Sequence, residues 1–576
     1  MKLISRSPAG LVAALAAVSL GACSSSSDDP NQPAEPTVQL EFTPASVTFG
    51  EDRSRAVELA NTGDEAAGPV ELVALAVTDA GGNEVPGASL SVSPSEVATL
   101  NAGVSRALTL TLDVPGSVGS GDYDVDLEAR VGGEAAASLG TSFSVVQDPG
   151  PVIETLEITG GAPQARQGEV LSFAASATDD QGQPVNDPMV TWRAEPAFAG
   201  LTTAGGEYVG YSVGTARIIA EAGGAADTVE VDVTSRDAPS GSFQLAWHEP
   251  VELRYTSDHW EHGDVAYTGT WGCRAVPGGQ CGNTLYVWDI TVRTAPVLTD
   301  SIQVDARVVN DVKVRADGTL AIITHESSND GLNGITLLDL TDPLQPTVIT
   351  RFAAPDLSPG VHNVWIEGDY AYLVVDGAVP SSGLRVLDIS DPANPLIVAS
   401  FYGGGSFLHD VYVRDGLAFL SHWTTGLIIL DVGNGVAGGS PTSPVEVSRI
   451  AVPGYDVHNA WYWPEAGYVF LGDEIAVPGR VLVIDVNDLS APAQVASFTL
   501  AGAAPHNFWV DEDAGIAYFS WYENGIHAVD VSGRLLGELD KQARQVASIQ
   551  YDVGGACIAP SGTCSWAPQL HDGLIY

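Results

Sequence analysis

The sequence predicts an all-β protein in which two β-sandwiches are followed by a seven-bladed β-propeller whose last blade is incomplete. Three observations support this fold class. Glycine and proline are plentiful, with 63 and 35 residues, and short segments of alternating apolar and polar residues lie between turn residues. In the C-terminal part, two short phrases recur in phase, roughly every 50 residues, as in a propeller built from repeated four-stranded blades.

The first segment is predicted to be a targeting signal and no part of the fold. Lys2 and Arg6 precede an apolar stretch, 9–20, that is too short to span a bilayer. The stretch ends in Leu-Gly-Ala-Cys, which resembles the bacterial lipobox. That resemblance implies removal of residues 1–22, lipid attachment at Cys23, and a flexible tether over 23–37. We therefore expect an exported protein, anchored in the outer membrane and facing the periplasm or the cell surface.

Two β-sandwiches are expected over 38–148 and 150–235, where short alternating strands are broken by Gly, Pro, Asn and Asp. The first segment resembles the Ig-like modules of bacterial surface proteins. The second contains GTARIIAEAGG and is similar to the group 2 bacterial Ig-like domain. Its GYSVG at 210–214 fits the pattern of serine hydrolases, but no helix is expected after it, so we assign it no catalytic role.

The propeller prediction, 243–576, depends on two columns of repeated residues. The first opens a predicted strand with a His-Asn or His-Asp pair, as in HNVWIE at 362. Its copies start at Asn310, His362, His409, His458 and His506, at spacings of 52, 47, 49 and 48 residues. The second column closes a predicted third strand with an aspartate, at Asp289, Asp339, Asp388, Asp431, Asp485 and Asp530. We expect these aspartates to cap turns.

The phrase GLRVLDISDPANP at 383–395 resembles the LVIVD repeat, and the C-terminal region is similar to bacterial LVIVD-repeat surface proteins. With strands assigned as HNVWIE, YAYLVV, GLRVLDI and LIVASF, seven blade starts can be counted, and the seventh stops within its second strand. The segment 243–255 is a candidate to close the ring by pairing with it.

Cys273 with Cys281 and Cys557 with Cys564 form two close pairs. In an exported protein such pairs are expected to form disulfides, and neither has the spacing of a zinc site. Of the three possible connectivities, we predict local pairing.

The repeated histidines are the candidate site. Strand starts and the loops between second and third strands share one face of a propeller, so imidazoles and carboxylates should converge at the mouth of its channel. The predicted metal or ligand residues are His362, His409, His458, His506, Asp311, Asp410, His325 and His422, and Glu326 and Glu474 lie in the same loops. The alternative is that each imidazole satisfies backbone groups between blades.

Aromatic residues in those loops, Trp423, Trp521 and Tyr522, are predicted to stack on a ligand. No catalytic constellation is evident. No cofactor is predicted with certainty, and a divalent metal is the candidate. The net charge of −48 argues against nucleic acid as a partner. The expected function is therefore recognition or adhesion, with a surface protein or glycan as ligand. The alternative is a metal-binding protein or metal-dependent enzyme that uses the His ring.

Overall fold

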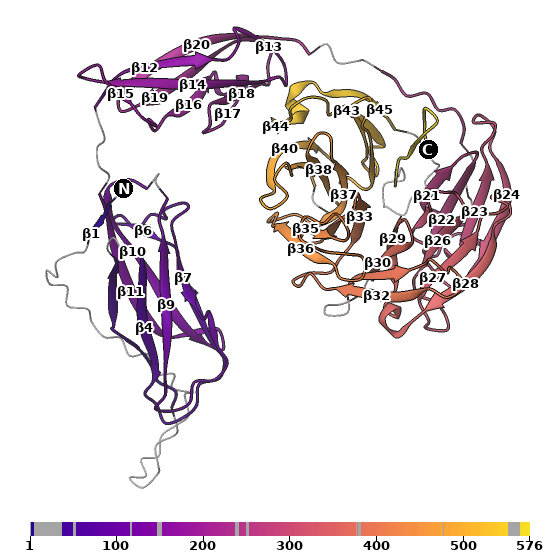
Figure 1. Cartoon of the computed structure of the whole chain (residues 1–576), viewed down its shortest axis with the longest axis horizontal. Helices are drawn as coiled ribbons and strands as arrows, with labels where there is room; N and C mark the ends of the chain where they lie inside the picture. Colours follow the sequence, from indigo (N-terminus) through magenta and orange to yellow (C-terminus); the bar gives the residue numbers. More distant parts are fainter. Residues whose placement is uncertain are drawn as a thin grey trace. The chain divides into compact units, whose positions relative to one another are not determined.

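The computed structural model (Figure 1) describes residues 2–4, 37–49, 53–115, 118–146, 152–236, 241–248, 251, 253–375, 377, 382–475, 477–550 and 565–576. The described residues form strands and three short 3₁₀ helices: η1 (Ala197–Ala199), η2 (Pro355–Leu357) and η3 (Leu539–Gln542). None of the helices found in this part of the chain is long and apolar enough to cross a membrane. Cys23 lies outside the described residues.

The chain divides into two compact units, 1–152 and 153–576. The first unit contains two sheets. One has the order β2-β4-β9-β7, and the other has the order β1-β11-β10-β5-β8, with β3 and β6 pairing at its sides. The strands are β1 (Lys2–Ile4), β2 (Leu40–Thr43), β3 (Ser46–Phe49), β4 (Ser54–Asn61), β5 (Val70–Ala74), β6 (Thr78–Asp79), β7 (Ser89–Ser93), β8 (Glu96–Val97), β9 (Ser105–Asp113), β10 (Gly121–Val131) and β11 (Glu134–Val146). Alternate residues of the two sheets, such as Leu59, Leu110, Leu127 and Phe143, pack into one core.

The second unit begins with two further sheets, of orders β12-β14-β18-β17, with β15 paired to β14, and β13-β20-β19-β16. Their strands are β12 (Ile153–Gly160), β13 (Gln164–Arg166), β14 (Val170–Asp179), β15 (Pro184–Val185), β16 (Thr191–Glu195), β17 (Gly200–Thr202), β18 (Glu207–Gly210), β19 (Gly214–Ala222) and β20 (Ala225–Thr234). Tyr208, Ile218 and Val231 are fully buried in the core that these sheets share.

In the described residues six sheets follow, each with four antiparallel strands, and Figure 1 shows them arranged around a common axis. The strands of the first three are β21 (Tyr255–His262), β22 (Val265–Trp271), β23 (Thr284–Asp289), β24 (Val297–Gln303), β25 (Val312–Val314), β26 (Leu320–His325), β27 (Gly334–Asp339), β28 (Thr347–Ala353), β29 (Val361–Glu367), β30 (Tyr370–Val375), β31 (Gly383–Asp388) and β32 (Leu396–Phe401). In the third sheet, the observed strands match the four that the sequence predicts.

The other three sheets, the second of them extended by β44, have strands β33 (Asp410–Arg414), β34 (Leu417–His422), β35 (Gly426–Asp431), β36 (Val445–Ile450), β37 (Val457–Trp463), β38 (Tyr468–Asp473), β39 (Gly479–Asp485), β40 (Ala493–Leu500), β44 (Gly537–Glu538), β41 (Phe508–Asp511), β42 (Ile516–Ser520), β43 (Ile526–Asp530) and β45 (Gln545–Ile549). Neighbouring sheets share cores: Val386 and Val374 of the third pack with Leu420 and Ile428 of the fourth. The core of this region therefore lies between the sheets.

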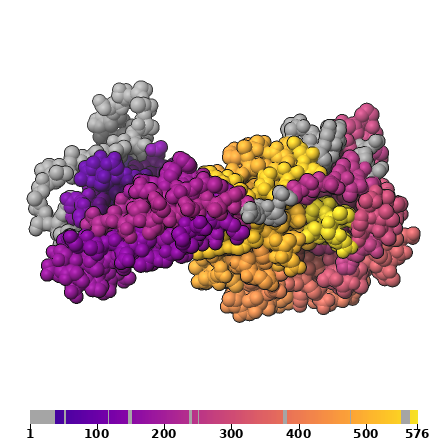
Figure 2. All heavy atoms as spheres, turned by 90° about the horizontal axis from the view of Figure 1, so that it is seen from above, coloured from indigo at the N-terminus to yellow at the C-terminus, as the bar shows by residue number. Residues whose placement is uncertain are grey.

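Residues 565–576 join the last four-stranded sheet to the first. They contain the hairpin β46 (Leu570–His571) and β47 (Leu574–Ile575). On one side the Asn507 N–H donates to the Trp566 carbonyl (3.1 Å), and on the other the Glu261 N–H donates to Gln569 Oε1 (3.2 Å). The space-filling view shows these yellow residues beside the pink ones of the first sheet (Figure 2). The sequence offered the segment 243–255 as the closing strand. Its described residues before Tyr255, namely 243–248, 251, 253 and 254, form no strand.

The aspartates that end the third strands cap turns, as predicted. Asp289, Asp339, Asp388, Asp485 and Asp530 each accept the backbone N–H two residues further on. Asp431 accepts four N–H groups from the glycine-rich loop 433–439. The Cys273–Cys281 disulfide is present, whereas Cys557 and Cys564 lie outside the described residues.

Candidate functional site

The candidate site lies where the first strands of the sheets begin. Each sheet is antiparallel, so the start of the first strand, the loop between the second and third, and the exit of the fourth share one face. We call this the mouth face. In two sheets the pairing register shifts where the His-Asn pair enters the strand, between Val361 and Val364 and between Val457 and Ala460. This irregularity lets two consecutive residues, such as His362 and Asn363, both be buried near the axis.

Six flat side chains form a closed ring at the mouth. The centroid of the His409 ring lies 4.7 Å from His362 and 4.4 Å from His458. His506 follows at 4.2 Å from His458 and 4.2 Å from Trp566. Trp271, at 5.6 Å from Trp566 and 6.0 Å from His362, closes the circuit. The structure thus brings together all four histidines of the predicted column.

Burial favours the neutral form of three of these imidazoles, those of His409, His458 and His506. Desolvation, and then the neighbouring His362, lower the pKa of His458 to about 3. For His506, desolvation and then His458 lower the pKa to about 3. The pKa of His409 is also lowered well below its ordinary value, by desolvation first and by neighbouring imidazoles second. Neutral imidazoles are the form that binds metals and accepts hydrogen bonds.

Two glutamates from the loops between second and third strands reach the ring. Glu326 Oε1 lies 2.7 Å from His362 Nδ1. Glu474 Oε2 lies 3.8 Å from His409 Nε2 and 3.9 Å from His458 Nε2. The Tyr522 hydroxyl donates to the other oxygen, Glu474 Oε1, at 2.6 Å. The ring therefore contains two different environments: a His362–Glu326 pair, and a group of His409, His458 and Glu474.

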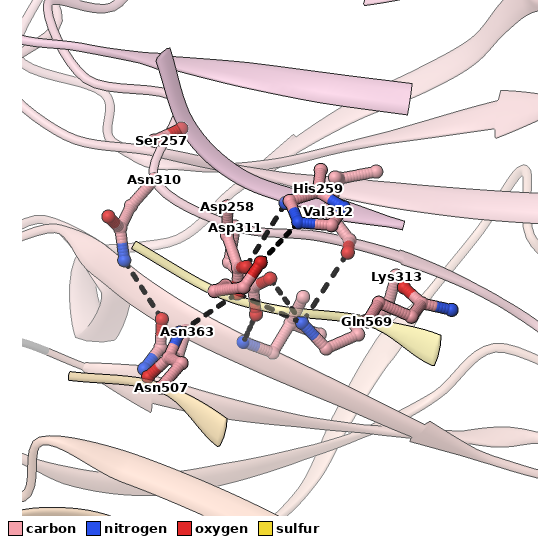
Figure 3. A network of polar contacts seen from close by, with 12 residues as sticks. Ser257, Asp258, His259, Asn310, Asp311, Val312, Lys313, Asn363, Asn507 and Gln569 are labelled. Atoms are coloured by element: carbon pink, nitrogen blue, oxygen red, sulfur yellow. Dashed lines mark hydrogen bonds and ion pairs between the residues drawn. The ribbon is translucent and has the colours of Figure 1, made fainter. Parts of the chain in front are cut away.

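Below the ring, the acid and amide column forms a belt of hydrogen bonds between sheets (Figure 3). Lys313 pairs with Asp311 and lies 3.5 Å from Asp258. Asp311 Oδ2 accepts the Val364 N–H (2.9 Å). In the same belt, Asn363 Nδ2 donates to Asp410 Oδ1 (2.9 Å). Asp311 and Asp410, which the sequence offered as metal or ligand residues, thus lie in this belt with partners from neighbouring sheets.

The belt contains carboxyl groups with raised pKa values. Desolvation, and then the charge of Asp311, raise the pKa of Asp410 to about 7. Desolvation is also the main cause that raises the pKa of Asp311 to about 6, against the opposing charge of Lys313. The carboxyl group of Asp410 is therefore partly protonated near neutral pH.

Deeper along the axis, five aromatic rings form a collar around the channel, with neighbouring centroids 4.5–6.2 Å apart: Trp260, Trp365, Tyr412, Trp461 and Trp509. Lys313 occupies the same position in the second sheet and holds its ammonium 5.1 Å from the Trp260 ring. Belt and collar line a cavity of about 80 Å³. The predicted site residues do not include Lys313. Its place in a column of aromatic residues, two positions after an aspartate, nevertheless distinguishes it in the sequence.

The structure places three predicted site residues apart from the ring. His325 is fully buried and bonds Thr336 of its own sheet. His422 is 2% exposed and packs under Gly403. Trp521 is fully buried, and its indole N–H donates to the Ala503 carbonyl (2.9 Å), so it offers no face to a ligand. Successive side chains of a strand alternate in direction, and these three share one position of the repeat.

The next residue of the repeat points to the mouth. In four sheets the residue that follows this buried position contacts the ring. These residues are Glu326, Trp423, Glu474 and Tyr522. Trp423 stacks on His409 with centroids 5.1 Å apart. Of the three predicted stacking residues, Trp423 and Tyr522 therefore lie at the mouth.

The fold and the site define an all-β protein with repeated four-stranded sheets in a propeller-like arrangement. Residues 360–402 and 408–452 match the LVIVD repeat family. These ranges coincide with the third and fourth sheets, so the chain carries LVIVD repeats. No curated protein sequence matches the chain.

Three solved structures illustrate the similarity. A putative 6-phosphogluconolactonase from Bacteroides uniformis is 14% identical, with 52% of this chain and 86% of that chain covered and a TM-score of 0.40. The C-terminal WD40 domain of Sif2 is 13% identical, with 70% and 90% covered and a TM-score of 0.36. A protein from Lactobacillus plantarum is 12% identical, with 49% and 82% covered and a TM-score of 0.39. Similarities at this level define no activity for this chain.

Proposed function

We propose that this chain is an exported recognition protein that binds a protein ligand on the mouth face of a seven-bladed propeller. The observation that carries the proposal is the apolar surface of that face. Four large apolar side chains on its loops are strongly exposed: Leu332 (57%), Tyr402 (53%), Ile475 (59%) and Val477 (64%). The opposite face also exposes apolar side chains, such as Val292 and Leu396. On the mouth face they lie on the same side as the ring of aromatic and imidazole groups, and this combination favours an interaction site there.

Aromatic residues support the same surface from within. Phe407 and Trp423 stack with centroids 4.7 Å apart, and both are partly exposed. Rigid aromatic anchors surrounded by aliphatic side chains are typical of binding hot spots on proteins. Because three of the four exposed side chains are aliphatic, we favour a protein over a glycan as ligand.

The rest of the chain fits a presentation role. In this proposal a lipid on Cys23 anchors the chain in the outer membrane, the tether 23–37 gives reach, and two Ig-like sandwiches carry the propeller outward. The net charge of −48 favours solubility of the protein and opposes its binding to nucleic acid.

The experiment compares binding to bacterial cells before and after protease treatment, using the secreted chain with Cys23→Ser. The variant Trp423→Ala/Ile475→Ser/Val477→Ser removes the mouth surface. The matched control, Val292→Ser/Val436→Ser, removes two side chains that are 58% and 50% exposed on the opposite face. We expect saturable binding that the mouth variant and the protease abolish and the control preserves. Binding that resists protease but is lost on periodate oxidation of glycans would contradict a protein ligand, and absence of any binding would overturn recognition.

The sequence also suggests metal binding or metal-dependent catalysis by the His ring. This alternative involves the imidazoles on the same mouth face. It is compatible with recognition at the rim, because the apolar side chains and the imidazoles are different residues.

A further inference from the structure

We propose that His409, His458 and Glu474 form a binding site for one divalent transition-metal ion of the zinc type. This inference goes beyond recognition and holds whether or not the mouth face binds a protein. Among the described residues, these three alone offer imidazole and carboxylate ligand atoms that all lie within 4.8 Å of one another.

The distances are close to those of a closed site. Zinc bonds of about 2.1 Å in a tetrahedral arrangement put neighbouring ligand atoms about 3.4 Å apart. Glu474 Oε2 lies 3.8 Å from His409 Nε2 and 3.9 Å from His458 Nε2. Side-chain shifts of a few tenths of an ångström would therefore bring the ligands to bonding geometry. Two imidazoles and one carboxylate form a donor set that zinc uses, with a position left for a water molecule or another ligand.

The local charge also favours a cation. Glu474 is largely buried, with 19% of its side chain exposed, and its partners in ion-pair range among the described residues are the two imidazoles. No lysine or arginine of the described residues lies within ion-pair range of the Glu474 carboxylate. A partly buried carboxylate without a cation is unfavourable, and a divalent ion bound by the three groups would remove this cost.

The Nδ1 atoms of these two histidines lack the partners that the other two members of the ring have. His409 Nδ1 and His458 Nδ1 are both buried without a hydrogen-bond partner in the part of the chain described. By contrast, His506 Nδ1 lies 2.8 Å from the Trp566 carbonyl, and His362 Nδ1 lies 2.7 Å from Glu326. The four-histidine ring therefore separates into two members with evident structural partners and two that converge on a carboxylate.

Tyr522 is a positioning residue for this site. Its hydroxyl holds Glu474 Oε1 at 2.6 Å, which leaves Oε2 turned toward the two imidazoles. Trp423 packs flat against His409, with an interplanar angle of 27°. Both residues have a left-handed backbone, with φ of 34° and 27°. That conformation is unfavourable for a non-glycine residue and is found at functional sites.

The test is a titration of the metal-stripped full chain with Zn²⁺, followed by calorimetry, with Co²⁺ absorption as a second readout. Glu474→Gln keeps the size of the side chain and its acceptor for Tyr522 but removes the ligand charge. Glu326→Gln is the matched control, because Glu326 has the same place in the repeat and bonds His362. His248→Ala tests an exposed histidine elsewhere on the chain.

We expect one ion per chain, affinity lowered at least 100-fold by Glu474→Gln and by His409→Ala/His458→Ala, and about 10- to 100-fold by Tyr522→Phe with unchanged stoichiometry. Glu326→Gln and His248→Ala should bind within threefold of the parent. If the double histidine variant fails to fold, Glu474→Gln and Tyr522→Phe decide the question. The proposal is overturned by an absence of stoichiometric binding, or by equal affinities of the parent and Glu474→Gln.

Discussion

Replacement of Asp410 by asparagine should stabilise the protein above neutral pH. The Asp410 carboxylate accepts hydrogen bonds from Asn363 Nδ2 (2.9 Å) and the Val411 N–H (2.7 Å) through the same oxygen. An asparagine can keep both bonds through its side-chain oxygen. Three other sheets already have an asparagine in this position, namely Asn363, Asn459 and Asn507. The substitution therefore removes a partly buried charge without creating a cavity.

The magnitude follows from the raised pKa of Asp410. Desolvation and the Asp311 charge move this pKa from 3.8 to about 7. The folded protein thus binds the proton more tightly than the unfolded chain, and the free energy of unfolding falls as the pH rises through this interval. At 1.36 kcal/mol per pKa unit, the charged group costs about 4 kcal/mol at pH 8 and less than about 1 kcal/mol at pH 4. A new amide N–H₂ that finds no acceptor would offset about 1 kcal/mol of this gain.

The assay is urea unfolding with EDTA present, followed by the fluorescence of the tryptophan collar, at pH 4 and pH 8. Asp388→Asn, in a solvent-exposed turn of the opposite face, is the control for a general effect of charge removal. The reasoning predicts a gain from Asp410→Asn at pH 8 that shrinks at pH 4. A variant less stable than the parent at pH 8, or an equal gain at both pH values, would refute it.

Two further substitutions test the electrostatic roles of Lys313 and Asp431. Lys313→Met should lower the free energy of unfolding by about 3 kcal/mol or more at pH 8, because Asp258 and Asp311 lose their cation. The loss should be smaller at pH 5, since the Asp311 carboxyl, with a pKa of about 6, can take up a proton. A loss of stability in urea unfolding that does not depend on pH would argue against this pairing. Asp431→Ala should cost about 3 kcal/mol, against about 1 kcal/mol for Asp388→Ala, because four backbone N–H groups lose their acceptor instead of one. Equal effects of the two substitutions, or unchanged hydrogen exchange over the loop 433–439, would contradict this.

The repeated sheets could be predicted in detail because their signals are local. Alternating residues and turn-capping aspartates determine where each strand runs, so the predicted HNVWIE, YAYLVV and LIVASF differ from β29, β30 and β32 by at most one residue. The convergence of the histidine column follows from the same period. Closure of the ring is harder to predict. The residues after Ser565 bridge the two sheets through separate contacts, such as those of Trp566 and Gln569. The described residues of 243–254 form no strand.

The site itself was only partly predictable, because one position in a strand decides which way a side chain points. His325, His422 and Trp521 belong to the buried position, and the residues that follow them face the mouth. The grouping of His409 and His458 with Glu474, apart from His362 and His506, depends on loop geometry that no single repeat encodes. Lys313 had a sequence signal, but its two carboxylate partners come from different sheets.

Anomalous diffraction at the zinc edge, from crystals of the full chain grown with Zn²⁺, would locate the ion. We expect a single strong peak on the axis of the repeated sheets, within about 2.3 Å of imidazole nitrogens of His409 and His458 and of a Glu474 oxygen. A peak bound elsewhere, or imidazoles of the repeated column found on separate surfaces instead of one mouth, would contradict this expectation.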